Sequence, residues 1–270
     1  MSKKQPLIPP FDKKVHLEDY DPDYTNDFDK ESETKKQLED DLARLRDLQE
    51  ALYAESKQSL LVVLQAIDAG GKDGTISHVF RGLNPQGVHI ASFKTPNTEE
   101  QAHDYLWRIH KQVPAKGYIG VFNRSHYEEV LIVRVHDLVP KQVWKKRYAQ
   151  INDFERMLTE NGTTILKFFL YISKEEQKKR FQSRLDEPEK QWKFALGDLE
   201  ERALWDDYIA AFEDMLTKCN TEYAPWRIIP SNKKWYRNLV VTRAIIDALE
   251  GMNPKYPKAA ENLEKVVIPD

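Results

Sequence analysis

The chain alternates between two kinds of hydrophobic pattern. One is the short continuous apolar run, such as SLLVVLQAID at 59–68, which is typical of a strand buried on both faces of a parallel sheet. The other is an apolar residue about every three or four positions, which marks one face of an amphipathic helix. Before the first strand this spacing is kept by Leu38, Leu42, Leu45, Leu48 and Leu52. The start of the chain therefore predicts a helix followed by a buried strand.

The same alternation continues to the C-terminal part of the chain. Further strands are predicted at 88–94, 118–125, 163–173 and 225–231. Helices are predicted at 98–114, 140–162, 174–186, 198–219 and 232–252, with a short one after the first strand. Strands separated by helices imply βαβ units, so we expect an α/β fold with a doubly wound parallel sheet.

No internal repeat or change of composition divides the sequence, so we expect a single domain over residues 1–270. Residues 1–35 are rich in Pro, Asp and Lys and lack a clean periodicity. We interpret them as an irregular N-terminal arm on the main domain.

Composition and charge exclude several classes of protein. The 41 Lys and Arg residues nearly balance the 44 Asp and Glu residues, which is no electrostatic match for nucleic acid. Cys219 is the single cysteine and cannot form an internal disulfide. The apolar runs are far shorter than the ~20 residues of a membrane helix, and the first residues lack the features of a signal peptide. We expect a soluble, cytoplasmic protein without a membrane or nucleic-acid partner.

The segment LLVVLQAIDAGGKDGTI at 60–76 carries the clearest chemical signal. A buried strand runs into a glycine-containing turn, then Lys72, then a helix start, which suits the binding of phosphate. The segment is related to the phosphate-loop pattern G-x-x-x-x-G-K-S/T, but Ala66 and Asp73 depart from it. Asp68 could hold a magnesium ion or act as a base. The alternatives are a turn with a surface lysine and an Asp that accepts hydrogen bonds from the turn.

Two other clusters of charge follow later strands. FNRSHYEE at 122–129 places Arg124, Glu128 and Glu129 at the carboxyl end of a second buried strand, where open α/β sheets bind ligands. This cluster could equally be a network of surface ion pairs.

A basic cluster lies in and after the helix predicted at 174–186. Arg180 and Arg184 are four residues apart and share one helix face. Lys190 and Lys193 follow. This segment is either a solvated helix or a movable lid that binds phosphate.

Five ordered motifs resemble the second family of polyphosphate kinases. They are IDAGGKDGTI (67–76), SFKTP (92–96), KGYIGVFNRSHYEEV (116–130), EEQKKRFQSRLDEPEKQWKF (175–194) and APWRIIPSNKKWYRN (224–238). The resemblance implies a thymidylate-kinase-like P-loop kinase fold with a helical lid at about 174–197. It also implies reversible phosphoryl transfer from inorganic polyphosphate to nucleotides with Mg²⁺, or Mn²⁺, in a homo-oligomer, either a dimer or a tetramer. FNRSHYEEV resembles the class III branch, which phosphorylates AMP and ADP and so makes ADP and ATP, whereas the other branches carry FDRSWYNR.

The resemblance also implies a role for individual residues. The catalytic set is Asp68, Lys72, Arg124 and Glu128. The phosphate-binding set is Ala69, Gly70, Gly71, Lys72, Asp73 and Gly74. The nucleotide-binding set is Lys94, Thr95, Pro96, Asn123 and Arg124. The polyphosphate-binding set in the lid is Arg180, Arg184, Lys190 and Lys193. The metal ligands are Asp68, Glu128 and Glu129, with Asn123 standing where other branches have an Asp.

Two other functions remain open from the residues themselves. An ATP-dependent nucleoside or nucleotide kinase could use the same fold, although the altered phosphate loop argues against it. A non-catalytic protein that binds polyanions or nucleotides could carry a degenerate loop, although Lys72, Asp68 and Arg124 argue against that. Formation of ATP from ADP, with polyphosphate as the only donor, distinguishes the three.

Overall fold

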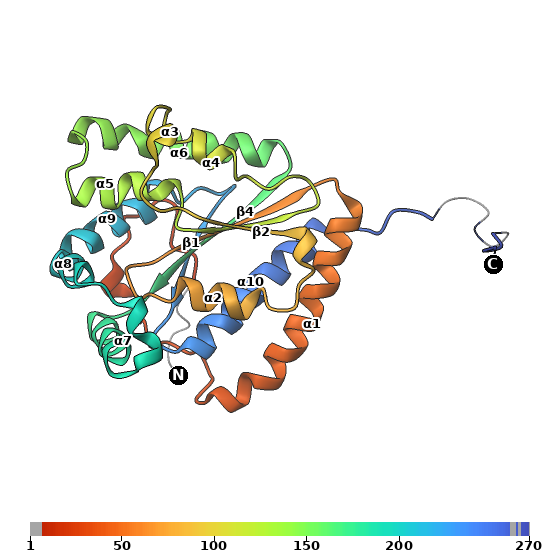
Figure 1. Cartoon of the computed structure of the whole chain (residues 1–270), viewed down its shortest axis with the longest axis horizontal. Coiled ribbons are helices and arrows are strands. Elements are labelled where there is room, and N and C mark those ends of the chain that lie inside the picture. The colour runs from red at the N-terminus through yellow and green to blue at the C-terminus, as the bar shows by residue number, and fades with distance from the viewer. Residues whose placement is uncertain (1–6, 260–262, 264–265, 270) are drawn as a thin grey trace.

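A parallel sheet of five strands forms the centre of the computed structural model, which describes residues 7–259, 263 and 266–269 (Figure 1). The strand order is β2-β3-β1-β4-β5, and all neighbouring pairs are parallel. Their bounds are β1 (Ser59–Gln65), β2 (Val88–Ser92), β3 (Ile119–Asn123), β4 (Thr163–Tyr171) and β5 (Trp226–Pro230). Strand β1 is central, and every one of its residues is buried. The α/β fold class predicted from the hydrophobic pattern is confirmed.

Helices cover both faces of the sheet (Figure 1). On one face lie α1 (Glu31–Glu55), α2 (Lys72–Val79) and α10 (Lys234–Met252), whose apolar residues share a core with the sheet. On the other face lie α5 (Ile132–Val135), α6 (Lys141–Glu160) and α9 (Trp205–Lys218), which form a second core. A doubly wound sheet has this arrangement because each parallel crossover places a helix on one face.

The segment predicted as a lid is helical. It consists of α7 (Lys174–Asp186), the 3₁₀ helix η4 (Pro188–Lys193) and the start of α8 (Gly197–Ala203). Phe181 is the buried anchor of α7, and its ring meets that of Phe194 edge to face at 6.0 Å. Helix α7 has the bounds that the sequence pattern predicted. It begins at Lys174 because Ser173 caps the first turn by accepting from the Glu176 amide at 3.1 Å.

Two of the helices predicted as continuous are interrupted in the structure, so their prediction as single helices is wrong. The helix predicted at 98–114 is two separate turns, α3 (Thr98–Gln101) and α4 (Trp107–His110). The break occurs at Asp104, whose Oδ1 accepts from the Leu106 amide at 2.9 Å. A short polar side chain that bonds the local backbone in this way competes with the helix.

The helix predicted at 198–219 is divided into α8 and α9 at Leu204. The Leu204 amide bonds the carbonyl of Glu201, which tightens the last turn of α8. The side chain of Arg202 leaves that turn toward α7 and donates to the Lys174 carbonyl at 2.8 Å. This contact attaches α8 to the lid while α9 continues along the sheet.

The N-terminal arm is irregular over residues 7–30 except for the 3₁₀ turn η1 (Leu17–Asp19). Val15 and Leu17 are buried, and the Leu17 amide donates to Glu213 Oε1 on α9 at 2.8 Å. The arm ends earlier than predicted because α1 starts at Glu31, where acidic side chains in the first turn favour a helix N-terminus. Residues 1–6 of the predicted arm lie outside the described residues.

Two further 3₁₀ helices connect the elements, η2 (Pro85–Gly87) before β2 and η3 (His126–Val130) after β3. Among the described residues, no helix is both long enough and apolar enough to cross a membrane.

Candidate active site

The loop between β1 and α2 turns sharply because two of its residues adopt the left-handed conformation. Ala69 has φ 59° and Gly71 has φ 102°. A Cβ on Gly70 would lie 2.4 Å from the Cβ of Ala66, and one on Gly71 would lie 2.0 Å from Nη1 of Arg237. The loop therefore needs glycine at both positions. No side chain caps the N-terminus of α2, so the amides of its first turn remain available to an anion.

Lys72 is the first residue of α2 and is buried. Its Nζ donates to the carbonyl of Ala66 at 2.8 Å. Burial lowers the pKa of Lys72, and the charge of Arg124 lowers it further, while the carboxylates of Asp68 and Glu128 oppose this shift. Lys72 thus places a cation at the loop, and among the described residues no carboxylate forms an ion pair with it.

Asp68 and Arg124 form an ion pair between the carboxyl ends of two neighbouring strands. Arg124 Nη2 lies 2.9 Å from Asp68 Oδ1, and both side chains are about one-third exposed. The Arg124 backbone is left-handed, with φ 62°, and its amide donates to the Leu64 carbonyl of β1 at 3.1 Å. This bond fixes the chain after β3 against the end of β1, so the pair lies at the loop.

Glu128 joins the same group of charges from η3. Burial raises the pKa of the Glu128 carboxyl, whereas Arg124 and Lys72 act to lower it. Because its charge is felt at both cations and at Asp68, Glu128 belongs to the loop cluster. The structure therefore brings together all four residues predicted as catalytic.

The neighbouring Glu129 faces another element. Its Oε2 lies 2.5 Å from Arg147 Nη1 on α6. Burial raises the pKa of Glu129, and Arg147 opposes the shift. Glu129 is one of the predicted metal ligands, and in this structure its carboxylate is paired with Arg147 of α6.

Asn123 connects β3 to the phosphate loop. Its Nδ2 donates to Asp73 Oδ1 at 2.6 Å. An amide can donate to a carboxylate, whereas a second carboxylate at position 123 would repel Asp73. Asn123 and Asp73 therefore suit one another as a pair.

The lid helix α7 contacts the backbone of the loop. Arg180 donates to the carbonyls of Ala69 at 2.8 Å and Ser231 at 2.5 Å, and its Nε bonds Glu176 at 2.8 Å. Gln177 donates to the Asp68 carbonyl at 3.0 Å. These contacts tie α7 to the loop.

The other predicted lid cations lie further along the lid. Arg184 donates to the Lys193 carbonyl at 3.1 Å and to Asp198 at 3.3 Å. Lys190 pairs with Glu187. The exposed Lys193 has its Nζ 5.0 Å from the centre of the Trp192 ring.

The turn after β2 carries the three residues predicted to bind the nucleoside. The Lys94 carbonyl accepts from Arg108 at 2.8 Å, and the Pro96 carbonyl accepts from Gln101 at 2.8 Å. Lys94 and Thr95 are exposed. Within the described part of the chain, no hydrogen bond or ion pair connects this turn to the phosphate loop.

Sequence analysis missed two residues that contact the loop. Gln177 could have been found, because it lies three positions before Arg180 on the same helix face. Arg237 lies in the motif at 224–238, but neither its residue type nor its spacing indicated a contact with the loop. It lies in α10, only 2% exposed, and reaches the underside of Gly71 because α10 packs beside α2.

The described residues contain no group of three or more His, Cys, Asp and Glu side chains arranged to hold a metal ion. The loop cluster offers two carboxylates, Asp68 and Glu128. Mg²⁺ is commonly held by one or two carboxylates together with substrate phosphates and water. The residues present therefore fit a metal that arrives with the phosphate substrate.

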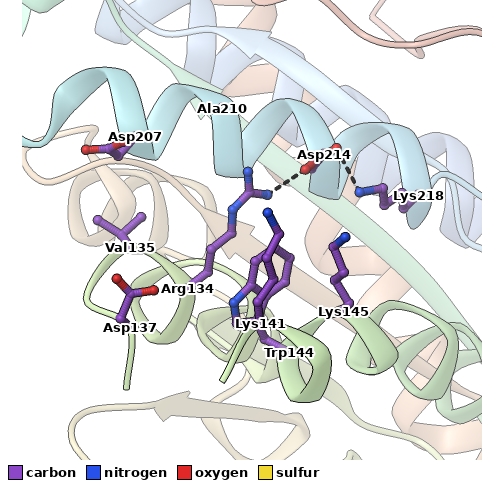
Figure 2. Close-up of a pocket in the computed structure, with 10 residues that line it drawn as sticks. All are labelled: Arg134, Val135, Asp137, Lys141, Trp144, Lys145, Asp207, Ala210, Asp214 and Lys218. Atoms are coloured by element: carbon purple, nitrogen blue, oxygen red, sulfur yellow. Dashed lines mark hydrogen bonds and ion pairs between the residues drawn. The ribbon is translucent and has the colours of Figure 1, made fainter. Parts of the chain in front are cut away.

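An open cavity of about 560 Å³ lies between α5, α6 and α9 (Figure 2). Three of its charged residues form ion pairs: Arg134 lies 2.6 Å from Asp214, and Lys218 lies 2.9 Å from the same carboxylate. Arg134 also covers the Trp144 ring at 4.8 Å. None of the lining residues is a predicted site residue, so we assign the candidate active site to the phosphate loop.

Known proteins resemble this chain over nearly its whole length. The family model described as Polyphosphate kinase 2 (PPK2) matches residues 28–257. A protein of Meiothermus ruber named AMP/ADP-polyphosphate phosphotransferase is 55% identical over 95% of this chain and 97% of its own. An ADP-polyphosphate phosphotransferase of Rhodopseudomonas palustris is 46% identical over 86% of this chain and 84% of its own.

The fold leads to the same group. The crystal structure of polyphosphate kinase 2 from Arthrobacter aurescens TC1 superimposes with a TM-score of 0.92 at 47% identity, covering 96% of this chain and 93% of that chain. The predicted P-loop kinase architecture is thereby confirmed. This chain belongs to the polyphosphate kinase 2 family.

Proposed function

We propose that this protein moves a phosphoryl group reversibly from inorganic polyphosphate to AMP and ADP. The observation that carries the proposal is the charged cluster at the carboxyl edge of β1 and β3, where Asp68 and Lys72 of the phosphate loop interact with Arg124 and Glu128. Membership of the polyphosphate kinase 2 family and the name of the Meiothermus relative support the donor and both acceptors.

The transfer requires positioning and cancellation of charge more than covalent help. A phosphate oxygen of the acceptor attacks the terminal phosphorus of polyphosphate, and the bond to the next bridging oxygen breaks, leaving a chain shorter by one phosphate. Lys72 and the amides at the start of α2 bind the transferring group. Arg124, held by Asp68 at 2.9 Å, binds the acceptor phosphate on the neighbouring strand.

The donor chain extends from the loop toward the lid. Arg180 is already bonded to the Ala69 carbonyl, so we assign it the phosphate nearest the loop. Arg184, Lys190 and Lys193 provide cations along η4 and the end of α7 for later phosphates. A repeated polyanion on a row of cations can shift register, which permits stepwise use of one chain.

Asp68 and Glu128 would hold Mg²⁺, or Mn²⁺, at this site. The metal would supply positive charge to the phosphate oxygens during transfer. Lys94, Thr95 and Pro96 would border the nucleoside, with Arg108 holding the Lys94 carbonyl in place. We further propose a homo-oligomer, a dimer or tetramer, on the family resemblance; sedimentation equilibrium tests this state.

The deciding experiment supplies long-chain polyphosphate as the only phosphoryl donor, with Mg²⁺ and either ADP or AMP. We expect ATP from ADP, and ADP followed by ATP from AMP. The Lys72→Ala protein, purified in the same way, controls for contaminating kinases. Phosphorylation of AMP by ATP without any use of polyphosphate would instead identify an ATP-dependent nucleotide kinase.

A further inference from the structure

Arg237 is a buried cation that has no carboxylate partner among the residues that the structure describes. Its side chain is on the first turn of α10, and the residue is 2% exposed. Its Nη2 and Nε donate to the side-chain oxygen of Asn238, at 2.9 and 3.2 Å, and that oxygen carries no charge. A buried charge normally has an ion-pair partner, because removing it from water is costly. Within the described part of the fold, no carboxylate therefore compensates the charge of Arg237.

Other basic side chains lie near Arg237. Burial lowers the pKa of Arg237 to about 9, and the neighbouring Arg180 contributes in the same direction. Lys234, one turn earlier on α10, has a pKa lowered by burial and then by Arg180 and Arg237. At neutral pH Arg237 remains protonated, so its positive charge is present on this side of the loop.

The guanidinium of Arg237 lies directly beneath the phosphate loop. Its Nη1 is 2.0 Å from the point where a Cβ on Gly71 would lie, and its Nη2 is 3.4 Å from the corresponding point on Gly74. The same stretch of backbone begins α2, whose N-terminus is not capped by any side chain. A charge in this place acts on an anion bound at the loop through a thin layer of backbone, where water screens it little.

We infer that Arg237 is a buried countercharge for the donor phosphates. When the phosphates bind at the loop, their negative charge compensates the positive charge of Arg237. Arg237 does not touch the ligand; it is a positioning residue that strengthens the anion site of the loop. The inference rests on the proposed polyphosphate donor. It also predicts an unusual relation: neutralising Arg237 should leave the free protein as stable or more stable while weakening phosphate binding.

Two variants neutralise this charge in different ways. Asn238→Asp keeps the shape of the side chain and supplies a carboxylate at the atom that Arg237 already contacts. Arg237→Met removes the charge and leaves an apolar side chain of similar length. Arg237→Lys retains a cation. The matched control is Arg227→Met, since Arg227 is a half-buried arginine on β5 whose pKa is also lowered by burial, with Asp247 opposing the shift.

The experiment measures the melting temperature with and without inorganic tripolyphosphate, and its Kd by calorimetry, at one ionic strength. We expect Asn238→Asp and Arg237→Met to melt at or above the wild-type temperature without ligand. Their Kd should rise about tenfold or more, with a smaller ligand-induced shift in melting temperature. Arg237→Lys and Arg227→Met should bind within about threefold of wild type.

Three results would overturn the inference, two of them specific to Arg237 and its control. One is a lower melting temperature in both neutralised variants with an unchanged Kd, which would make Arg237 purely structural. The other is an equal loss of affinity in Arg227→Met, which would make the effect one of net charge. If Arg237→Met does not fold, Asn238→Asp and Arg237→Lys decide. Wild-type protein that neither binds tripolyphosphate nor makes ATP would overturn the proposed function as well, whereas tight binding by every variant would overturn this inference alone.

Discussion

Two buried lysines occupy very different electrostatic surroundings. Lys167, in the middle of β4, donates to Glu155 at 2.6 Å, to Tyr127 Oη at 2.8 Å and to the Cys219 carbonyl at 2.7 Å. Lys72, at the phosphate loop, donates to a single backbone carbonyl. One lysine is thus satisfied by the fold, and the other is left for a ligand.

Their effects on neighbouring groups differ accordingly. Burial alone would raise the pKa of Glu155, but contact with Lys167 and His126 lowers it, so the fold itself stabilises the carboxylate beside Lys167. At the loop, burial raises the pKa of Glu128 and lowers that of Lys72, so each charge is held there at a cost. Buried charge that the fold itself does not neutralise is therefore a signal of ligand binding in this protein.

The sharpest test of this contrast is Lys167→Met. It leaves the Glu155 carboxylate buried without its cation, and such a loss typically costs about 3–5 kcal/mol of unfolding free energy. Urea denaturation measures this change. The KM for polyphosphate should be unchanged in the protein that remains folded. Adding Glu155→Leu should restore most of the stability; a double variant as unstable as the single one would contradict the pairing.

The second test is Lys72→Ala. Loss of a cation that stabilises the transferring phosphate should lower turnover by about 100-fold or more, since a single oriented donor has an effect of that size. The free energy of unfolding should change by less than about 1 kcal/mol, because no ion pair is broken. Lys145→Ala, on the surface of α6, provides the control. More than a tenth of wild-type turnover would remove Lys72 from the transfer step.

Glu128→Gln tests the acid side of the cluster. AMP brings one phosphate fewer than ADP, so its site has greater need of a carboxylate to position a metal. We expect kcat/KM for AMP to fall about tenfold further than that for ADP. Equal losses for the two acceptors would make Glu128 a general catalytic or structural residue.

The same variant has a signature in its pH profile. Ionised Glu128 exists only above its pKa, which burial raises, so the activity that depends on it is lost as the pH falls through that raised value. The acid limb for AMP should lie above the ordinary Glu pKa of about 4.3. In Glu128→Gln the acid limb of the AMP activity profile should move to lower pH. If it does not move, another group is responsible for the acid limb.

The smallest expected effect is in the lid. Arg184→Ala should raise the KM for polyphosphate about threefold and weaken its dependence on salt, because Arg184 lies in a partly exposed cluster with Asp198. Lys179→Ala, an exposed cation on the same helix, is the control. If the KM of the two variants responds equally to a series of salt concentrations, the lid attracts polyphosphate by its general charge and Arg184 has no specific contact with the chain.

Hydrophobic patterning predicted the sheet and most helices, since buried strands and amphipathic helices leave a local record. It failed at Asp104, where one side chain bonds the backbone and ends a helix. The four catalytic candidates could be found because they stand in or just after strands that meet at one edge. Arg237 could not, because its place beneath Gly71 arises from the packing of α10, more than 150 residues later in the chain. The ion pair of Lys167 could not be predicted either, since a lysine within an apolar strand does not identify its partner.

The central place of β1 also determines when the phosphate loop can acquire its shape. Leu64 pairs with Asn123 on one side and with Phe168 on the other. During synthesis, the loop after β1 leaves the ribosome long before either neighbouring strand. Contacts that span such distances along the chain form late in folding. A chain that has not yet produced β4 thus carries the whole phosphate-loop sequence without the sheet edge that orients it, and it should gain affinity for polyanions only when the strand carrying Lys167 is in place.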